Sequence, residues 1–344
     1  MDAISPATPA DAAYSLYNRP VRRVTGSDLH RPGVTCPICG HAGAEATFEV
    51  GGLASTVVVC RDCGTGFLDP PLTPAEIAAQ YPPTYYGSTG RKFTRLVEWG
   101  VRLVGRRHVE FLARQTPAGG RILDVGCGRG ILLKHLADRG FEAHGFEVSE
   151  AAAEGVDPRI HLRIASDLAA AGYPESYFDQ IIIWHVFEHV SDPRSCLEEM
   201  RRIVKPGGEV VVAVPNFSSP QACVSGPAWF HLDLPRHLFH FPVEALKRLL
   251  ESTGFEVVSE HHFSLRQNPF GWVQSVLNRL PGLPRNGLYE LLHNHRQRSQ
   301  FPLAVKLVLW MAFVAGMPLG LAIEVVAAAL KRGATVHVVA RRLK

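Results

Sequence analysis

The 344-residue sequence lacks a marked excess of either charge. It has 36 Lys and Arg against 32 Asp and Glu, a net charge of +4, so its charge does not indicate a nucleic-acid-binding protein. No charged segment leads into an apolar run at the beginning of the sequence, and this argues against a secretory signal. Cysteine is scarce: there are seven, and four of them form two C-x-x-C pairs. This pattern favours a metal site in a reducing compartment over disulfides, and hence a cytoplasmic protein.

The dinucleotide-binding pattern G-x-G-x-x-G is also missing. Residues 121–130 read RILDVGCGRG, an apolar run and a glycine-rich turn, and an apolar-periodic segment follows. This order predicts a strand, a tight turn and a helix, with Ile131 where a dinucleotide site needs its third glycine. Asp124 stands at the turn, where it would repel a phosphate and suits a cationic or polar ligand. Three residues without Cβ let the backbone turn sharply and approach that ligand: Gly126, Gly128 and Gly130.

This stretch resembles the first motif of the class I S-adenosylmethionine-dependent methyltransferases. The resemblance extends over residues 117–263, where a buried strand, EHV at 188–190, a helix, KPGG at 205–208 and a strand ending in VPN at 214–216 follow in the family's order. It implies an α/β fold: a doubly wound, Rossmann-like, mainly parallel sheet of seven strands with helices on both faces. It also implies S-adenosylmethionine as cofactor and methyl transfer as the activity.

Further acids end the next two expected strands. Glu147 lies about 20 residues after the glycine turn, where an acid can accept hydrogen bonds from ribose hydroxyls. By resemblance, Asp167 meets the adenine amino group. The predicted cofactor-binding residues are therefore Asp124, Gly126, Gly128, Gly130, Glu147 and Asp167.

Two acceptor motifs are absent. Residues 184–186 read WHV where enzymes that methylate base amino groups often carry [Asn/Asp]-Pro-Pro-aromatic, and no Pro-Cys pair marks a cytosine nucleophile. A small molecule, a sugar or a lipid-linked compound remains as acceptor, for O- or C-methylation. Residues 229–241 are rich in histidine, and some related methyltransferases carry a similar D-x-P-R-H-L-x-x-F stretch, which could cover the acceptor. The candidate catalytic bases are His185, His237 and His240. The alternatives are an RNA methyltransferase that grips RNA with its cysteine module, and a non-catalytic scaffold with this fold.

The two C-x-x-C pairs lie 20 residues apart, each followed by glycine, with a hairpin expected between them. This spacing is typical of a four-thiolate zinc site, and a closed set of four sulfurs makes the metal structural. The predicted ligands are Cys36, Cys39, Cys60 and Cys63. Three tyrosines, at 81, 85 and 86, follow this module and could form part of a lid or pack the linker.

Residues 307–323 form an uncharged apolar run interrupted by Gly316 and Pro318. The run is short for a membrane span, which takes about 20 apolar residues, and a crossing would separate the last strand from its sheet. We expect a buried helical hairpin, a peripheral contact with the inner membrane surface, or a dimer face within 302–330. The predicted organisation is an arm at 1–30, a zinc module at 31–68, a linker with a helix or lid at 69–116, the methyltransferase core at 117–264, a helical insertion at 265–333, and the last strand with a basic tail at 334–344.

Overall fold

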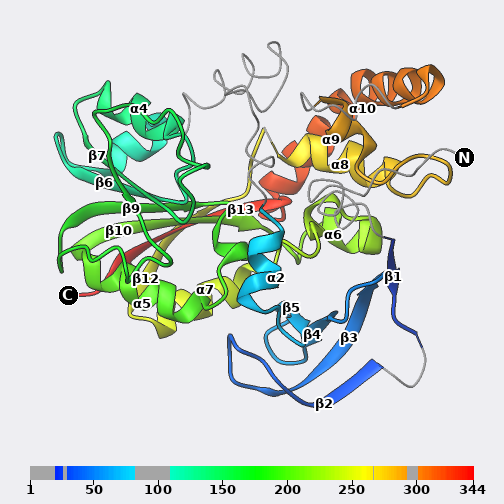
Figure 1. Cartoon of the computed structure of the whole chain (residues 1–344), viewed down its shortest axis with the longest axis horizontal. Coiled ribbons are helices and arrows are strands. Elements are labelled where there is room, and N and C mark those ends of the chain that lie inside the picture. Colours follow the sequence, from blue (N-terminus) through cyan, green and yellow to red (C-terminus); the bar gives the residue numbers. More distant parts are fainter. Residues whose placement is uncertain (1–19, 26–28, 82–108, 266, 293–300) are drawn as a thin grey trace, which may run out of the picture.

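The structure, a computed structural model, describes residues 20–25, 29–81, 109–265, 267–292 and 301–344. The core is a seven-stranded sheet in the order β12-β13-β10-β9-β6-β7-β8, in which only β13 runs antiparallel to its neighbours (Figure 1). This order confirms the predicted doubly wound, mainly parallel sheet. The strands are β6 (Arg121–Val125), β7 (Glu142–Glu147), β8 (His161–Ile164), β9 (Phe178–Trp184), β10 (Val204–Pro215), β12 (Phe255–His261) and β13 (Thr335–Arg342).

Helices cover both faces of this sheet. Strand β9 is buried on both sides, so its side chains alternate between two apolar layers. Ile182 packs in one layer with helix α4 (Ile131–Ala137), whereas Ile181 and Ile183 pack in the other. Helices α5 (Pro193–Ile203) and α7 (Val243–Ser252) bury their apolar stripes in this second layer.

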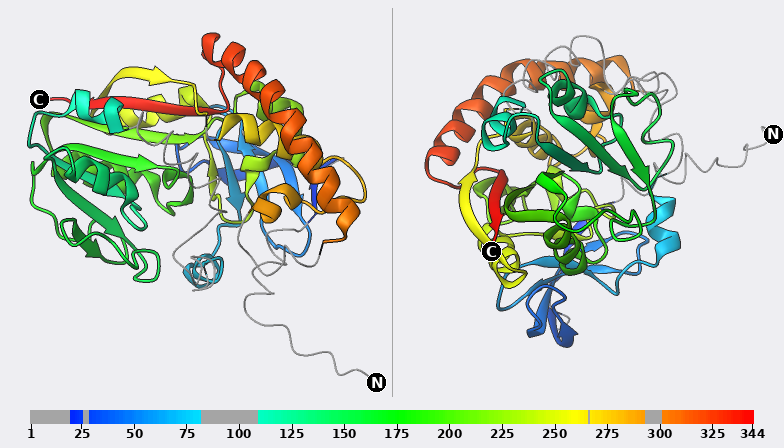
Figure 2. Two further views of the ribbon diagram at one scale, coloured as in Figure 1. Left: turned by 90° about the horizontal axis from the view of Figure 1, so that it is seen from above. Right: turned by 90° about the vertical axis from the view of Figure 1, so that its left-hand side faces the viewer.

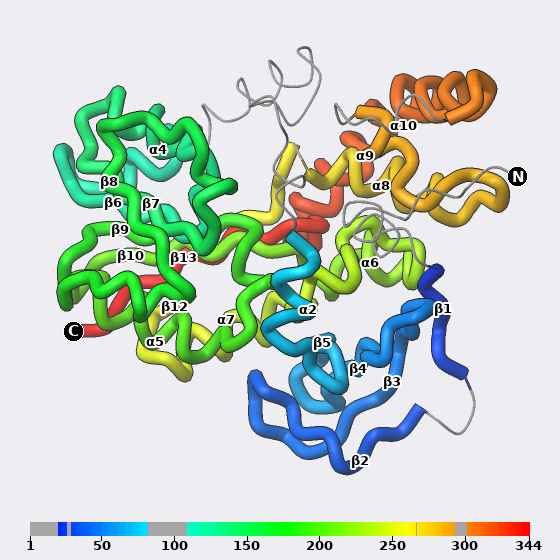
Figure 3. The backbone as a smooth tube through the Cα atoms, in the orientation of Figure 1, coloured from blue at the N-terminus to red at the C-terminus, as the bar shows by residue number. Residues whose placement is uncertain are grey.

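The N-terminal module is a second sheet, completed by the core. Its own strands are β1 (Val21–Arg23), β2 (His30–Thr35), β3 (Ala42–Val50), β4 (Thr56–Cys60) and β5 (Gly66–Asp69). The core adds the short strand β11 (Phe239–His240), which runs antiparallel to β5. The backbone tube shows this sheet beneath the core, with helix α2 (Pro74–Ala79) between the two (Figure 3). Because one hydrophobic cluster includes both Cys36 and Ile181, the module and the core share a continuous interior.

The insertion contains helices α8 (Asn268–Leu277), α9 (Gly287–Leu292) and α10 (Leu303–Ala329). Gly316 and Pro318 do not break the apolar run, which lies within one continuous 27-residue helix. Only Leu309, Gly320, Glu324 and Ala327 are buried in it, so the expected buried hairpin is wrong for this run. Helix α10 follows the outside of the molecule (Figure 2).

By length and composition α10 is the one helix among the described residues that could cross a membrane; its most apolar window has a mean hydropathy of 1.9 and is 17% buried. It packs along α8, where Gly316 and Gly320 allow close approach to Val273 and to the Pro269 backbone. Strand β13 follows directly in the core sheet. Tyr85, Tyr86 and residues 82–108 of the expected linker segment at 69–116 lie outside the described residues.

Candidate functional site

The glycine turn lies at the carboxyl end of β6. The Gly126 N–H donates to the Phe146 carbonyl at 2.8 Å, which closes the turn against β7. The three glycines have φ values of +75°, +52° and +65°, a region that favours glycine. A Cβ at Gly126 would lie 2.5 Å from Val186, whereas one at Gly128 would meet nothing within 4 Å. The turn is therefore packed on the β9 side and open above Gly128.

Asp124 and Glu147 are both buried beside this opening. Glu147 accepts hydrogen bonds from the Gly128 N–H at 2.7 Å and the Val148 N–H at 3.1 Å, so its carboxylate is fixed at the turn. Within the described part of the chain, no side chain or backbone donor bonds to the Asp124 carboxylate. Burial, and then the charge of Glu147, raise the pKa of Asp124 to about 8. A buried acid without a protein partner, next to open space, suits a cationic or hydroxyl-bearing ligand such as S-adenosylmethionine.

Asp167 follows β8, the strand beside β7 at the edge of the sheet. It is exposed, and its Oδ1 accepts the Ala170 N–H at 2.8 Å while the Ser166 hydroxyl donates to Oδ2 at 2.9 Å. These bonds hold the pKa of Asp167 below its usual range. The three acids thus end three adjacent strands, and the contact of Asp167 with adenine stays a prediction.

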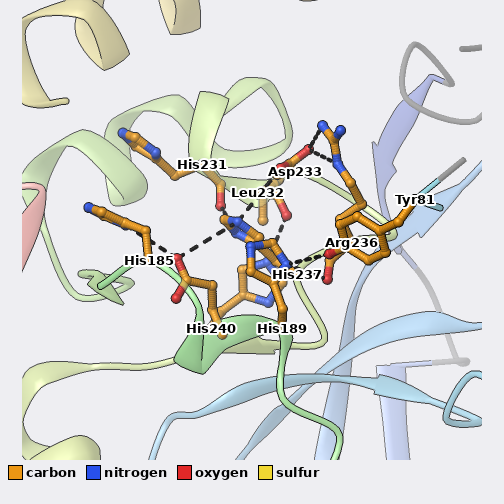
Figure 4. Close-up of polar contacts among 10 residues, drawn as sticks. Tyr81, His185, His189, His231, Leu232, Asp233, Arg236, His237 and His240 are labelled. Carbon is orange, nitrogen blue, oxygen red and sulfur yellow. Dashed lines mark hydrogen bonds and ion pairs between the residues drawn. The ribbon is translucent and has the colours of Figure 1, made fainter. Parts of the chain in front are cut away.

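His185 ends β9 in a left-handed conformation, with φ at +53°, that is uncommon for a residue with a Cβ. Its Nδ1 lies 3.3 Å from Oε1 of Glu188, and its Nε2 is buried without a hydrogen-bond partner among the described residues. Figure 4 shows the His185 ring on the opposite side of the cluster from His189 and His237. Its free nitrogen is therefore directed away from the polar cluster.

His237 and His240 lie deeper in the protein. Nδ1 of His237 donates to the His231 carbonyl at 2.9 Å, and Nε2 of His240 donates to the Leu232 carbonyl at 3.0 Å. Burial lowers the pKa of His240 to about 4 and that of His237 well below its ordinary value. Both rings are therefore neutral near pH 7, and these carbonyl bonds tie them to the fold.

The structure adds a contact that the sequence does not reveal. The Tyr81 hydroxyl lies 2.9 Å from Nδ1 of His189, across 108 residues of chain. Tyr81 follows α2, so the linker reaches the end of β9. The only sequence signal for this contact is the group of tyrosines at 81, 85 and 86, and that group does not indicate which residue Tyr81 contacts.

The four predicted zinc ligands come together. All four sulfurs lie within 4.8 Å of one another, with Cys36 and Cys63 at 3.7 Å and Cys39 and Cys60 at 3.6 Å. Gly40 and Gly64 have φ values of +75° and +72° and donate their N–H groups to the carbonyls of Cys36 and Cys60, which closes the two turns. The cysteines are free thiols, and the cluster is compatible with a structural zinc ion.

Residues 98–260 match a family model described as a methyltransferase domain. A ubiquinone biosynthesis O-methyltransferase of Azoarcus sp. is 34% identical over 41% of this chain and 66% of its own length. The corresponding enzyme of Alkalilimnicola ehrlichii is 38% identical over 28% of this chain and 42% of its own length. The chain thus spans less than two thirds of these curated relatives.

Among solved structures, phosphoethanolamine N-methyltransferase 2 of Haemonchus contortus is 17% identical, with a TM-score of 0.46 over 81% of this chain and 62% of its own. That likeness is too distant to carry an argument, so the fold assignment depends on the strand order itself. This order and the glycine turn, together with the family match, identify residues 98–260 as a class I S-adenosylmethionine-dependent methyltransferase domain.

Proposed function

We propose that this protein transfers a methyl group from S-adenosylmethionine to a hydroxyl oxygen of a small or lipid-linked acceptor. The observation that carries the proposal is the buried Asp124 carboxylate, which has no donor among the described residues and lies beside Glu147 and the open side of Gly128. The names of the similar enzymes, ubiquinone biosynthesis O-methyltransferases, favour oxygen as the methylated atom.

The cofactor would be held by the residues of the glycine turn. Asp124 and Glu147 supply acceptors for its positive charge and hydroxyls, and Gly128 lets the backbone come close to it. When bound, S-adenosylmethionine supplies a methyl group on a sulfonium, which an acceptor oxygen can displace. The chain's task is then to orient that oxygen and to remove its proton.

Among the three predicted bases, His185 is the best placed. Nδ1–H of His185 donates to Glu188, which leaves the Nε2 lone pair available to take the proton of the acceptor hydroxyl. His237 and His240 each use one ring nitrogen to bond a backbone carbonyl and are buried. We therefore assign proton transfer to His185 rather than to His237 or His240.

The lipid-linked class of acceptor is supported by α10. Its exposed face carries large apolar side chains, among them Met311, Val314 and Leu319, which are 63%, 69% and 64% exposed. Trp310 is also on this helix, whereas Trp272 is held by a bond to Glu324 and cannot serve as an interfacial anchor. An amphiphilic acceptor in the membrane surface would meet an enzyme docked there through α10, in a cytoplasmic, peripheral location.

The proposal is tested by supplying the purified protein with deuterated-methyl cofactor and separate water-soluble and lipid fractions of a cell extract. We expect one compound to gain a labelled methyl group, in the lipid fraction. His185→Gln should lower transfer at least about 100-fold and leave cofactor binding unchanged, because the base is lost and the pocket is kept. His261→Gln, an exposed histidine on β12, is the matched control. Cofactor binding with no labelled product in either fraction contradicts the proposal, and a product only in the aqueous fraction removes its lipid part.

A further inference from the structure

Four side chains that could bind a metal gather beyond the end of β9, away from the four cysteines. Glu188 and His189 belong to the short helix η3 (Phe187–His189), and Asp233 and His237 lie between the short helix η5 (Phe230–Leu232) and β11. One ligand atom from each of Glu188, His189 and His237 lies within 4.8 Å of the others. Nε2 of His237 lies 3.9 Å from Oε1 of Glu188 and 3.6 Å from Oδ2 of Asp233, and Figure 4 shows His237 between His189 and Asp233.

The hydrogen bonds of both histidines fix their protons on Nδ1. A backbone carbonyl can only accept, so the bond of His237 to the His231 carbonyl at 2.9 Å places its proton on Nδ1. His189 Nδ1 lies 2.9 Å from both the Arg236 carbonyl and the Tyr81 hydroxyl. The carbonyl can only accept, so both contacts are satisfied when Nδ1 carries the proton and the hydroxyl oxygen also accepts. Each ring is left with an unprotonated Nε2. A carbonyl that holds the other ring nitrogen is the usual arrangement around a metal-binding histidine.

The charge of Glu188 is the second observation. Its side chain is 2% exposed, and its Oε2 is buried without a hydrogen-bond partner in the described part of the chain. Among the described residues, the ion-pair partners of Glu188 are His185 and His237 alone, and burial keeps His237 neutral. A buried carboxylate without a lysine or arginine beside it is costly unless another cation compensates it.

We propose that Glu188, His189, His237 and Asp233 bind a divalent transition-metal ion, at a site separate from the four cysteines. Two imidazoles and two carboxylates suit Mn²⁺, Fe²⁺, Co²⁺ or Zn²⁺, and the cation compensates the charge of Glu188. The other oxygen of Asp233 accepts the Arg236 guanidinium at 2.5 Å, and His185 donates to Glu188, so both carboxylates have supporting partners. The site does not depend on methyl transfer and is tested without cofactor or acceptor.

Manganese(II) is the suitable probe because it prefers oxygen and imidazole ligands and does not displace zinc from four thiolates. The full zinc-loaded chain is titrated with Mn²⁺, and free Mn²⁺ is followed by electron paramagnetic resonance. We expect one bound ion per chain. Glu188→Gln and His237→Gln should each weaken binding at least about tenfold, since each removes a ligand. His240→Gln is the matched control, a neighbouring buried histidine outside the cluster, and should keep the wild-type affinity.

The wild type alone gives a second test that does not depend on the variants' folding. Paramagnetic Mn²⁺ should broaden the ring signals of His189 and His237 in a histidine-labelled sample before it affects His261. Absence of a bound ion in the wild type overturns the proposal. So does an unchanged affinity in both ligand variants, or equal broadening of all histidine signals.

Discussion

Two buried carboxylates, one in α10 and one at the end of β6, show how an acid with a structural role differs from an acid placed to bind a ligand. Glu324 lies in α10, where it accepts Trp272 Nε1 at 2.8 Å, Asn268 Nδ2 at 3.1 Å and the Ala334 N–H at 3.4 Å. Asp124 lies at the end of β6 and is 6% exposed, yet no described donor reaches it. Burial raises the pKa of both acids. The fold itself satisfies the acid that ties α10 to the sheet, whereas the acid at the sheet edge lacks its partner.

The largest effect that tests this contrast is the loss of ligand binding in Asp124→Asn. We expect its affinity for S-adenosylmethionine to fall about 30-fold or more, because an interaction with a charged group, here the cationic cofactor, contributes about 1.5–3 kcal/mol. Glu324→Gln should keep that affinity and lose about 1–3 kcal/mol of unfolding free energy, because buried donors lose their acceptor. Calorimetric titration and denaturant unfolding of each variant measure the two quantities.

Asp138→Asn is the charge-matched control for the first variant. Asp138 is an exposed acid after α4 that pairs with Arg159, outside the glycine turn. It should leave cofactor affinity within about twofold, since exposed pairs contribute little. If Asp124→Asn bound as tightly as this control, the ligand role of Asp124 would be wrong.

Alanine substitutions at one glycine in each region should have smaller effects that again distinguish the glycine turn from α10. The substitution Gly128→Ala adds a Cβ that meets no protein atom within 4 Å. The substitution Gly320→Ala adds a Cβ 2.7 Å from the Pro269 carbonyl oxygen. We expect Gly128→Ala to weaken cofactor binding about tenfold, because its methyl enters the ligand's space, and Gly320→Ala to lower stability by about 1–3 kcal/mol with binding intact.

Gly119→Ala controls for backbone strain, because Gly119 has a positive φ of +73° and open space like Gly128 but lies before β6, at the other end of the strand. It should lose about 1 kcal/mol of stability and keep its affinity. Equal binding by the Gly119 and Gly128 variants would place the ligand away from the turn.

The doubly wound sheet was predictable from the family resemblance, and its individual strands from short apolar runs that end in turn residues. Asp124, Glu147 and Asp167 follow three of these runs, and the carboxyl ends of parallel strands meet at one edge. The four-cysteine cluster was also predictable from local spacing, since a tight turn holds the two thiols of each C-x-x-C motif together. These features depend on nearby residues and on a family order of motifs.

Contacts between distant segments were not predictable. Strand β11 has only two residues, and nothing in them specifies β5, 170 residues earlier, as partner. The Tyr81–His189 contact is equally remote. In α10, Gly316 and Pro318 suggested a break, but Gly316 packs closely on Val273 of α8 and the helix continues through the proline. Tertiary packing therefore overrode the local helix-breaking tendency.

The smallest predicted effect concerns pH. The pKa of Asp124 is raised from 3.8 to about 8, so between about pH 4 and pH 8 the folded state keeps a proton that the unfolded state has released. The free energy of unfolding must then fall as pH rises through this window. Asp124→Asn carries no such proton, so its stability relative to wild type should rise between pH 5 and pH 8, by at most about 1.4 kcal/mol for each pH unit. Thermal unfolding at a series of pH values measures this, and parallel curves for the two proteins would contradict the raised pKa. Glu324→Gln also removes an acid with a raised pKa. Its amide nitrogen, however, replaces one carboxylate oxygen and cannot accept the hydrogen bond of that oxygen, from Trp272 or from Asn268, so its curve should stay below that of Asp124→Asn at every pH. At pH 8, Asp124→Asn should then be closer to wild type in stability, or above it, and Glu324→Gln should be below it. That difference would identify Asp124 as the carboxylate that binds a ligand rather than a group among the described residues.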